Sequence, residues 1–276
     1  HSASSGLMPA SALALFITVE PLLPPPKDAT RERSTMQDAK MQEFAKDWVE
    51  SVRRSLPRGE RDRVLKVFAP TAEGDKALVC RYVRAQRPPS DLDKSERALL
   101  RFVSLIPSLD DAALGSAASD SGGMAGHVSL DVWNTSHSFV ELNAGDAEEH
   151  AILFCNFLKS LNRESYVVLG RGIPEGDTCY VFTPGDAGRR EPQLWNTSSG
   201  RVYDVSDANC PLVSVGCLFD DTNIYANVQP SSKPQMLNWN LADAAHWRPF
   251  FGGKGGFAPP SPLPPSVQLP RVPFKR

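Results

Sequence analysis

The sequence lacks the features that mark membrane proteins and nucleic-acid-binding proteins. No run of apolar residues approaches the roughly 18 that a membrane-spanning helix needs. The 30 basic and 32 acidic residues nearly cancel, leaving a net charge of −2. This balance argues against a nucleic-acid groove and against a broad membrane-binding face. We therefore predict no transmembrane segment and no nucleic-acid partner.

Paired cysteines are also missing. The five cysteines are scattered, odd in number and without Cys-x-x-Cys spacing, so they indicate neither a disulfide framework nor a zinc site. We expect a reducing, cytoplasmic setting. Possible metal donors do cluster at Asp146, Glu148, Glu149 and His150, but consecutive helical residues point over different faces and do not favour a shared ion. We predict no metal and no cofactor.

The two ends of the chain differ in composition from its middle. The chain begins without an initiator methionine or a signal peptide, and we interpret it as an excised fragment that starts with a cloning remnant. Residues 1–33 hold one apolar strand, SALALFITVE, which needs a sheet to complete. Residues 252–276 are rich in glycine and proline, which predicts polyproline II or disorder. We expect this tail to dock on its own domain or on another molecule.

The middle of the chain is organised around residues 145–170. Asp146 and Glu149 have the spacing of a helix capping box. The apolar residues from Ala151 to Leu161 cover nearly every direction around the helix, which predicts a core helix. Tyr166 to Gly170 then reads as a strand. The sequence therefore predicts a buried helix that leads directly into a central strand.

The flanking segments predict helices before this motif and strands after it. A helix capped by Ser34 or Thr35 is expected to run to Leu56, and a second helix, capped by Ser90, is expected to end at Pro107. A hairpin is predicted from segments 64–69 and 77–83, and a loop at 110–126. Antiparallel strands are predicted at 178–183, 194–197, 201–205, 213–219 and 224–229. This order is typical of the α+β class.

A cysteine-nucleophile enzyme is not favoured by the residues. Such an enzyme needs a thiol near a helix N-terminus or a cation, and a histidine to carry the proton. The core helix begins with Ala147 instead. His150 and Cys155 lie about 140° apart around that helix, and Cys155 and Cys179 both sit in apolar runs that favour burial.

Seven sequence blocks, in one order, carry a resemblance to a known family. They are RFVSLIP (101–107), DVWNTS (131–136), GDAEEHAILFCNFL (145–158), IPEGDTCYVFT (173–183), LWNTSSGRVYD (194–204), CPLVSVGCLFDDTNIYANVQ (210–229) and HWRPFF (246–251). Together they resemble the transglutaminase-like domain of the ciliary transition-zone coiled-coil and C2-domain protein family, which is linked to the Joubert and Meckel ciliopathies. A centrosomal protein shares this domain. The resemblance covers residues 34–251, and residues 1–33 are similar to the end of the preceding C2 domain and a linker.

The resemblance implies a transglutaminase-like (papain-like) fold, with the core helix packed on an antiparallel sheet. It also implies that the positions of the family's cysteine, histidine and acidic residue are occupied here by Ala147, Thr178 and Asn196. None of these side chains supplies a nucleophile, a proton carrier near neutral pH or a carboxylate. By this resemblance the chain is a pseudoenzyme.

The expected role is a retained cleft that binds protein or peptide at the transition zone or basal body, and that cilium assembly needs. Candidate rim residues are Trp133, Asp146, Tyr180 and Trp195. The expected partners are other transition-zone proteins of the Meckel-syndrome complex, or tubulin tails. Two alternatives stay open: a packed structural spacer, and an active cysteine peptidase or transglutaminase that uses Cys155 or Cys179.

Overall fold

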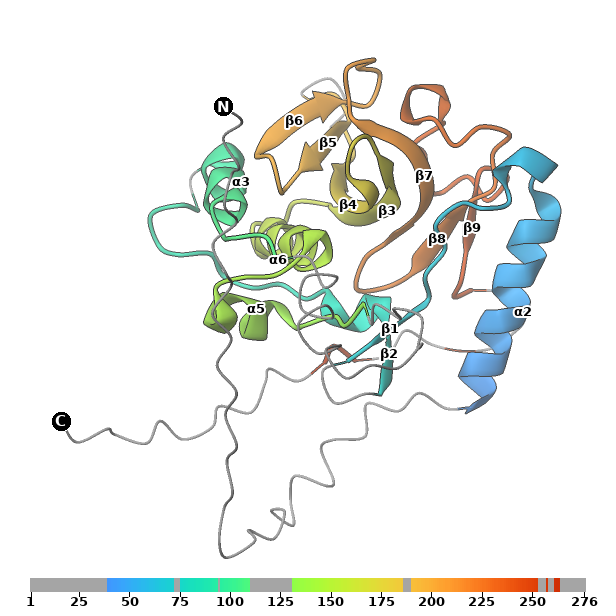
Figure 1. The fold of residues 1–276 in the computed structure, drawn as a ribbon, viewed down its shortest axis with the longest axis horizontal. Helices are drawn as coiled ribbons and strands as arrows, with labels where there is room; N and C mark the ends of the chain where they lie inside the picture. The colour runs from blue at the N-terminus through green and yellow to red at the C-terminus, as the bar shows by residue number, and fades with distance from the viewer. Residues whose placement is uncertain are drawn as a thin grey trace, which may run out of the picture. The chain divides into compact units, whose positions relative to one another are not determined.

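The computed structural model describes residues 39–71, 75–93, 95–109, 131–185, 190–252, 257 and 261–263 (Figure 1). The segment 1–33, the helix caps Ser34 and Thr35, the loop 110–126 and most of the tail lie outside these residues. Within the described residues, no helix has the length and apolar character to cross a membrane.

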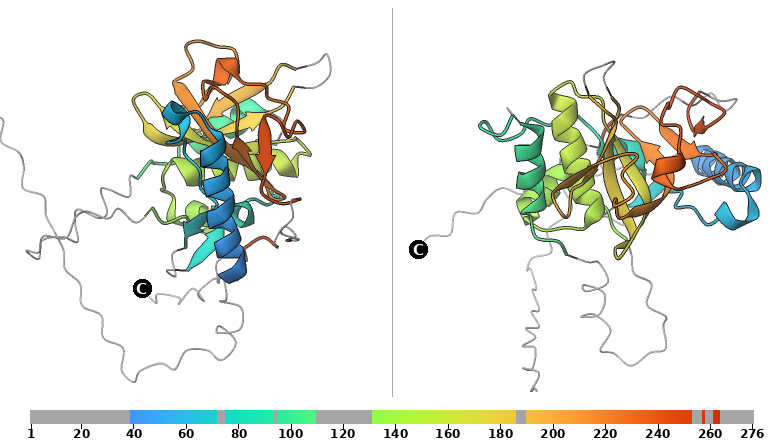
Figure 2. Two further views of the ribbon diagram at one scale, coloured as in Figure 1. Left: turned by 90° about the vertical axis from the view of Figure 1, so that its right-hand side faces the viewer. Right: turned by 90° about the horizontal axis from the view of Figure 1, so that it is seen from above.

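The first described helix, α2 (Ala39–Ser55), packs one face against the edge of the main sheet. Its buried residues recur every three or four positions, as predicted: Met41, Ala45, Trp48 and Val52. The Trp48 indole donates a hydrogen bond to the Pro249 carbonyl oxygen at 3.1 Å, and α2 lies beside strands β8 and β9 in Figures 1 and 2. Residues 39–55 therefore form the described part of the helix that the sequence predicts.

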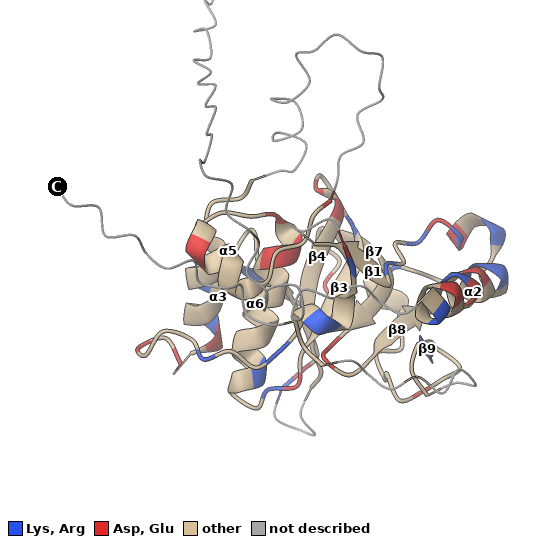
Figure 3. Cartoon of the chain, turned by 90° about the horizontal axis from the view of Figure 1, so that it is seen from below, with Lys and Arg blue, Asp and Glu red and all other residues tan. Residues whose placement is uncertain are grey.

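Acidic and basic residues alternate along α2 (Figure 3), whereas Arg63, which follows the helix, points into the domain. Arg63 is buried and donates hydrogen bonds to the carbonyl oxygens of Asn227 and Gln229, at 2.9 and 2.8 Å. It also pairs with Glu60 at 3.0 Å. This arginine ties the chain after α2 to the end of the sheet.

The next elements are shorter than the sequence predicts. The turn η1 (Arg58–Glu60) precedes strands β1 (Phe68–Pro70) and β2 (Lys76–Leu78), which pair antiparallel, and η2 (Val79–Tyr82) replaces the rest of the expected second strand. Helix α3 (Glu96–Ser104) is capped by Ser95, whose hydroxyl oxygen accepts a hydrogen bond from the Ala98 N–H. The predicted cap at Ser90 is wrong, because that residue lies too far before the helix to reach its free N–H groups.

The core helix is α6 (Ala147–Ser160), preceded by the short helix α5 (Ser136–Leu142). Every residue of α6 from Glu149 to Leu158 is buried. Seen from above, α6 lies between α3 and the sheet (Figure 2). The predicted core helix is confirmed.

The main sheet has seven antiparallel strands in the order β6-β5-β4-β3-β7-β8-β9. The predicted hairpins at 194–205 and 213–229 are both present. The turn η3 (Pro234–Met236) lies between the last two strands. The strands are β3 (Tyr166–Gly172), β4 (Gly176–Thr183), β5 (Gln193–Asn196), β6 (Arg201–Asp204), β7 (Leu212–Phe219), β8 (Ile224–Asn227) and β9 (Trp247–Pro249).

Each face of this sheet has its own apolar cluster. One face packs on α6 through residues such as Val167, Val181 and Phe219. The other face holds Tyr166, Val168, Phe182, Leu194 and Leu218 and is covered by the segment that carries Leu237, Trp239 and Leu241. A core helix on an antiparallel sheet confirms the predicted α+β class, and it is the arrangement expected of a transglutaminase-like domain.

Candidate functional site

The N-terminus of α6 is the place where the resemblance puts the family's cysteine, and here it is built from carboxylates. The Asp146 carboxylate accepts hydrogen bonds from the N–H groups of Glu148 and Glu149, and the Glu149 carboxylate accepts one from the Asp146 N–H at 2.9 Å. This is the predicted capping box. Ala147 stands in the first turn and carries no reactive group.

The Glu149 carboxylate also joins α6 to the chain before α5. Its second oxygen accepts hydrogen bonds from the Asn134 backbone N–H at 2.8 Å and from the Asn134 amide at 3.2 Å. Burial, reinforced by the neighbouring Asp146 carboxylate, raises the pKa of Glu149 to about 9. The same causes raise the pKa of Glu148 well above its usual range.

Trp133 belongs to the core and does not form an exposed rim, which corrects the sequence prediction. Only 1% of its surface is exposed, and its ring stacks against Phe219 with the centroids 6.0 Å apart. Its indole N–H donates to the Asp131 carboxylate at 2.8 Å. The Lys66 ammonium pairs with that carboxylate and lies 4.9 Å from the centre of the indole ring. Trp133 therefore anchors a partly exposed ion pair at the surface of the domain.

Tyr180 is also a core residue, on the sheet face that turns away from α6. It is fully buried, and its hydroxyl oxygen accepts a hydrogen bond from the Asn196 amide at 2.6 Å. Thr178 lies on the same face as Tyr180, since residues two apart in a strand share a face. The structure therefore places Ala147 on one side of the sheet and the side chains of Thr178 and Asn196 on the other, and does not gather the three into one cleft.

The side chains that do face α6 belong to the neighbouring positions. Cys179 and Trp195 lie in the apolar cluster that contains α6, and the Trp195 ring packs 5.3 Å from the ring of Phe154 on that helix. Cys179 is close enough to the start of α6 that the charges of Glu148 and Asp146 add to the effect of burial and raise its pKa. Adjacent residues of a strand lie on opposite faces of the sheet, so Cys179 and Trp195 face α6 while their neighbours Thr178 and Asn196 face away from it.

The cysteines show no sign of activation. All five are free and buried, and burial raises the pKa of Cys155 and of Cys217 to about 12. Cys155 contacts the Ser165 hydroxyl at 3.4 Å. Within the described part of the chain, no histidine hydrogen-bonds to a cysteine sulfur: His150 faces the carbonyl oxygens of Asp146 and Ile106, and His246 contacts Asp243 and Asn238. Among the same residues, no three metal-ligating side chains converge.

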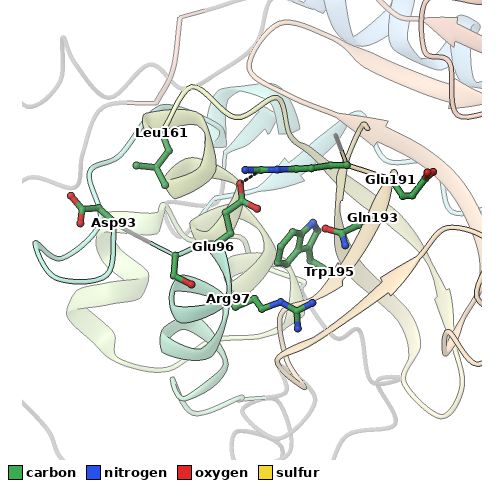
Figure 4. Close-up of a pocket in the computed structure, with 9 residues that line it drawn as sticks. Asp93, Glu96, Arg97, Leu161, Glu191, Gln193 and Trp195 are labelled. Carbon is green, nitrogen blue, oxygen red and sulfur yellow. Dashed lines mark hydrogen bonds and ion pairs between the residues drawn. The ribbon is translucent and has the colours of Figure 1, made fainter. Parts of the chain in front are cut away.

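A depression of about 700 Å³ lies at the opposite end of α6, beside Leu161 (Figure 4). Trp195 lines it, and is the one candidate rim residue that does so, although only 2% of its surface is exposed. On its wall, the Arg190 guanidinium pairs with the Glu96 carboxylate at 2.7 Å. Sequence reasoning missed this pair because 94 residues separate its members. The other lining residues are Asp93, Ser95, Arg97, Glu191 and Gln193.

Comparisons with known proteins find similar sequences elsewhere. Residues 131–250 match the family model of the CEP76 peptidase-like domain. Protein CC2D2B of Homo sapiens is 35% identical over 184 residues, which are 64% of this chain and 12% of that protein. Coiled-coil and C2 domain-containing protein 2A of Drosophila melanogaster is 27% identical over 205 residues, 71% of this chain and 14% of that protein.

A centrosomal protein and one solved structure are also similar. Centrosomal protein of 76 kDa from Homo sapiens is 25% identical over 236 residues, 80% of this chain and 33% of that protein. Calcium-bound LapG of Legionella pneumophila aligns with 72% of this chain and 96% of its own, at 13% identity and a TM-score of 0.37. This chain thus spans between 12% and 33% of the three relatives' lengths. Residues 131–250 therefore match the CEP76 peptidase-like domain family, and the chain is similar to the CC2D2 proteins and to centrosomal protein of 76 kDa.

Proposed function

We propose that this peptidase-like domain is catalytically inactive and serves as a protein- or peptide-binding scaffold at the ciliary transition zone and basal body. The observation that carries the proposal is the state of the thiols. All five cysteines are buried, and burial raises the pKa of each. A cysteine enzyme depends on a thiolate that substrate can reach.

The residues at the positions that the resemblance assigns to catalysis also lack the chemistry that a cysteine enzyme needs. Ala147, Thr178 and Asn196 hold no nucleophile, general base or carboxylate. The side chains that face α6 from the sheet, Cys179 and Trp195, do not replace them, since Cys179 has no histidine partner among the described residues and Trp195 cannot accept a proton. Peptide-bond cleavage and transamidation by a cysteine nucleophile both need a thiol activated by a base.

The depression beside Trp195 is the proposed contact surface. Its exposed walls carry charges of both signs, from Arg97 and Arg190 and from Asp93, Glu96 and Glu191. Mixed charge suits a folded or extended protein partner better than the uniformly acidic tail of tubulin. Other transition-zone proteins, such as those of the Meckel-syndrome complex, are thus the first candidate partners, and tubulin tails the second. The centrosomal relative supports a cytoplasmic, cilium-associated location.

The first test measures binding of candidate partners. The chain is immobilised and titrated with purified Meckel-complex proteins and with tubulin-tail peptides. Arg190→Glu reverses a charge that is 49% exposed, and Arg54→Glu is the matched control, an exposed arginine that also pairs with a glutamate. We expect Arg190→Glu to weaken partner binding about tenfold and Arg54→Glu to leave it unchanged. Equal effects of the two variants contradict the proposed surface.

The alternative function, a cysteine peptidase or transglutaminase that uses Cys155 or Cys179, is tested on the same samples. Peptide hydrolysis and amine incorporation are followed for the native chain and for Cys155→Ser and Cys179→Ser. A turnover that either substitution abolishes would establish the enzyme and refute the scaffold. We expect no turnover in any of the three samples.

A further inference from the structure

The described part of the proline-rich tail lies on the domain. Phe257 packs its ring 5.3 Å from the ring of Phe44 on α2. Leu263 is buried, and its backbone N–H donates a hydrogen bond to the Arg81 carbonyl oxygen in η2 at 2.8 Å. In return the Arg81 guanidinium donates to the Ser261 carbonyl oxygen at 3.1 Å. Two apolar anchors and two hydrogen bonds thus hold the tail between α2 and η2.

The sequence of this segment, Phe-Ala-Pro-Pro-Ser-Pro-Leu, is that of a proline-rich recognition peptide. Peptides that bind as polyproline II helices have three residues per turn, so two anchors six residues apart in such a peptide lie on one side of it. Its carbonyl oxygens have no internal hydrogen bonds and need donors from the receptor. The aromatic rings of Phe44 and Phe250, 5.2 Å apart, and the Arg81 guanidinium provide both kinds of contact.

We propose that the surface formed by Phe44, Phe250 and Arg81, here called the α2–η2 groove, is a binding site for proline-rich peptides. Its built-in ligand contacts it through Phe257, Ser261 and Leu263. A partner segment of the same chemistry, with an aromatic and a leucine anchor six residues apart, binds in trans when it displaces the built-in one. The groove is separate from the depression beside Trp195, so the inference goes beyond the proposed function.

The tether fixes how strongly the built-in ligand competes. Four residues, Gly253 to Gly256, join Phe257 to the last described residue of the domain. A ligand on so short a connection has an effective concentration on the order of 1 mM. For a peptide with a dissociation constant near 100 μM, this competition weakens apparent binding in trans about tenfold. The built-in segment therefore acts as a brake that a strong or multivalent partner can overcome.

The test releases the segment in the full-length chain. The F257D/L263D variant removes both anchors, and L142D/M236D is its control, because it places the same two charges at exposed apolar positions outside the groove. A fluorescent peptide of residues 256–265 is titrated into wild type and both variants. We expect the released variant to bind it about tenfold more tightly than wild type, and the control to match wild type. Arg81→Ala added to the released variant should abolish the gain.

Two further measurements keep the outcome decisive. Circular-dichroism melting establishes that the released variant unfolds cooperatively, and a peptide with Asp at both anchor positions establishes specificity. If the released, folded variant binds the native peptide no more tightly than wild type, or binds the Asp peptide equally well, the segment is only a structural strap and the proposal is wrong. Should the released variant not fold, native-state amide exchange of Leu263 in the wild-type chain decides. Protection of the Leu263 amide well below that of β3 supports a displaceable ligand, and protection equal to that of β3 refutes it.

Discussion

The strongest prediction concerns how slowly the native thiols react. Alkylation by iodoacetamide proceeds through the thiolate. With the Cys155 pKa raised from about 9 to about 12 by burial, the thiolate fraction at pH 8 falls from about a tenth to about one in ten thousand. Charge alone thus slows the reaction about a thousandfold, and the lack of access slows it further. Cys217, with the same pKa, should behave alike.

The assay follows each cysteine separately. The chain is treated with iodoacetamide at pH 8, with and without urea, and peptides are quantified by mass spectrometry over time. We expect native labelling of Cys155 and Cys217 at least a thousandfold slower than in urea, and slower native labelling of Cys179 as well. A single cysteine that reacts in the folded protein within tenfold of its rate in urea would refute the reasoning, because it would reveal an accessible thiolate. Near-UV circular dichroism verifies that the native sample stays folded.

Three other changes test the core. Asn156→Leu leaves the hydrogen-bond partners of the buried Asn156 amide unpaired. We expect the unfolding free energy to fall by about 3 kcal/mol and the melting temperature to fall by about 6–12 °C. Lys46→Ala, an exposed control, should change neither. The pKa of Glu149 is raised, so the folded state keeps a proton that the unfolded state loses above about pH 4.5. The unfolding free energy should therefore fall as the pH rises from about 4.5 to about 9. Glu149→Gln should flatten that slope in urea titrations. Gly216→Ala puts a methyl group 2.0 Å from the Val64 carbonyl oxygen, and urea unfolding should report a loss of about 2 kcal/mol or more.

The sequence predicts best where its signals are local. The capping box of α6 joins residues three apart, and the apolar stripe of α2 repeats within one helix, so both follow from short-range rules. The sheet face on which Thr178 and Asn196 lie does not follow from short-range rules. A sequence resemblance aligns residues along a strand, but the sheet face that each side chain occupies depends on the register. A shift of one position moves every side chain to the other face.

Burial and distant contacts are the other limits. Trp133 and Tyr180 are amphipathic, and their sequence context does not distinguish a rim residue from one whose polar atom finds a partner inside the protein, as Asp131 and Asn196 provide here. The pairing of Glu96 with Arg190 joins two segments far apart in the chain, and no local pattern in either segment announces it.

The borders of the seven-stranded sheet limit how other chains can approach it. On one border, β6 is four residues long and has exposed charged residues, Arg201 and Asp204, at its two ends. On the other, Pro249 in β9 has no N–H to offer, and its carbonyl oxygen is already taken by Trp48. Short charged strands and proline both discourage strand-to-strand association. Neighbouring molecules would thus meet this domain through its side chains, without extending its sheet into a filament.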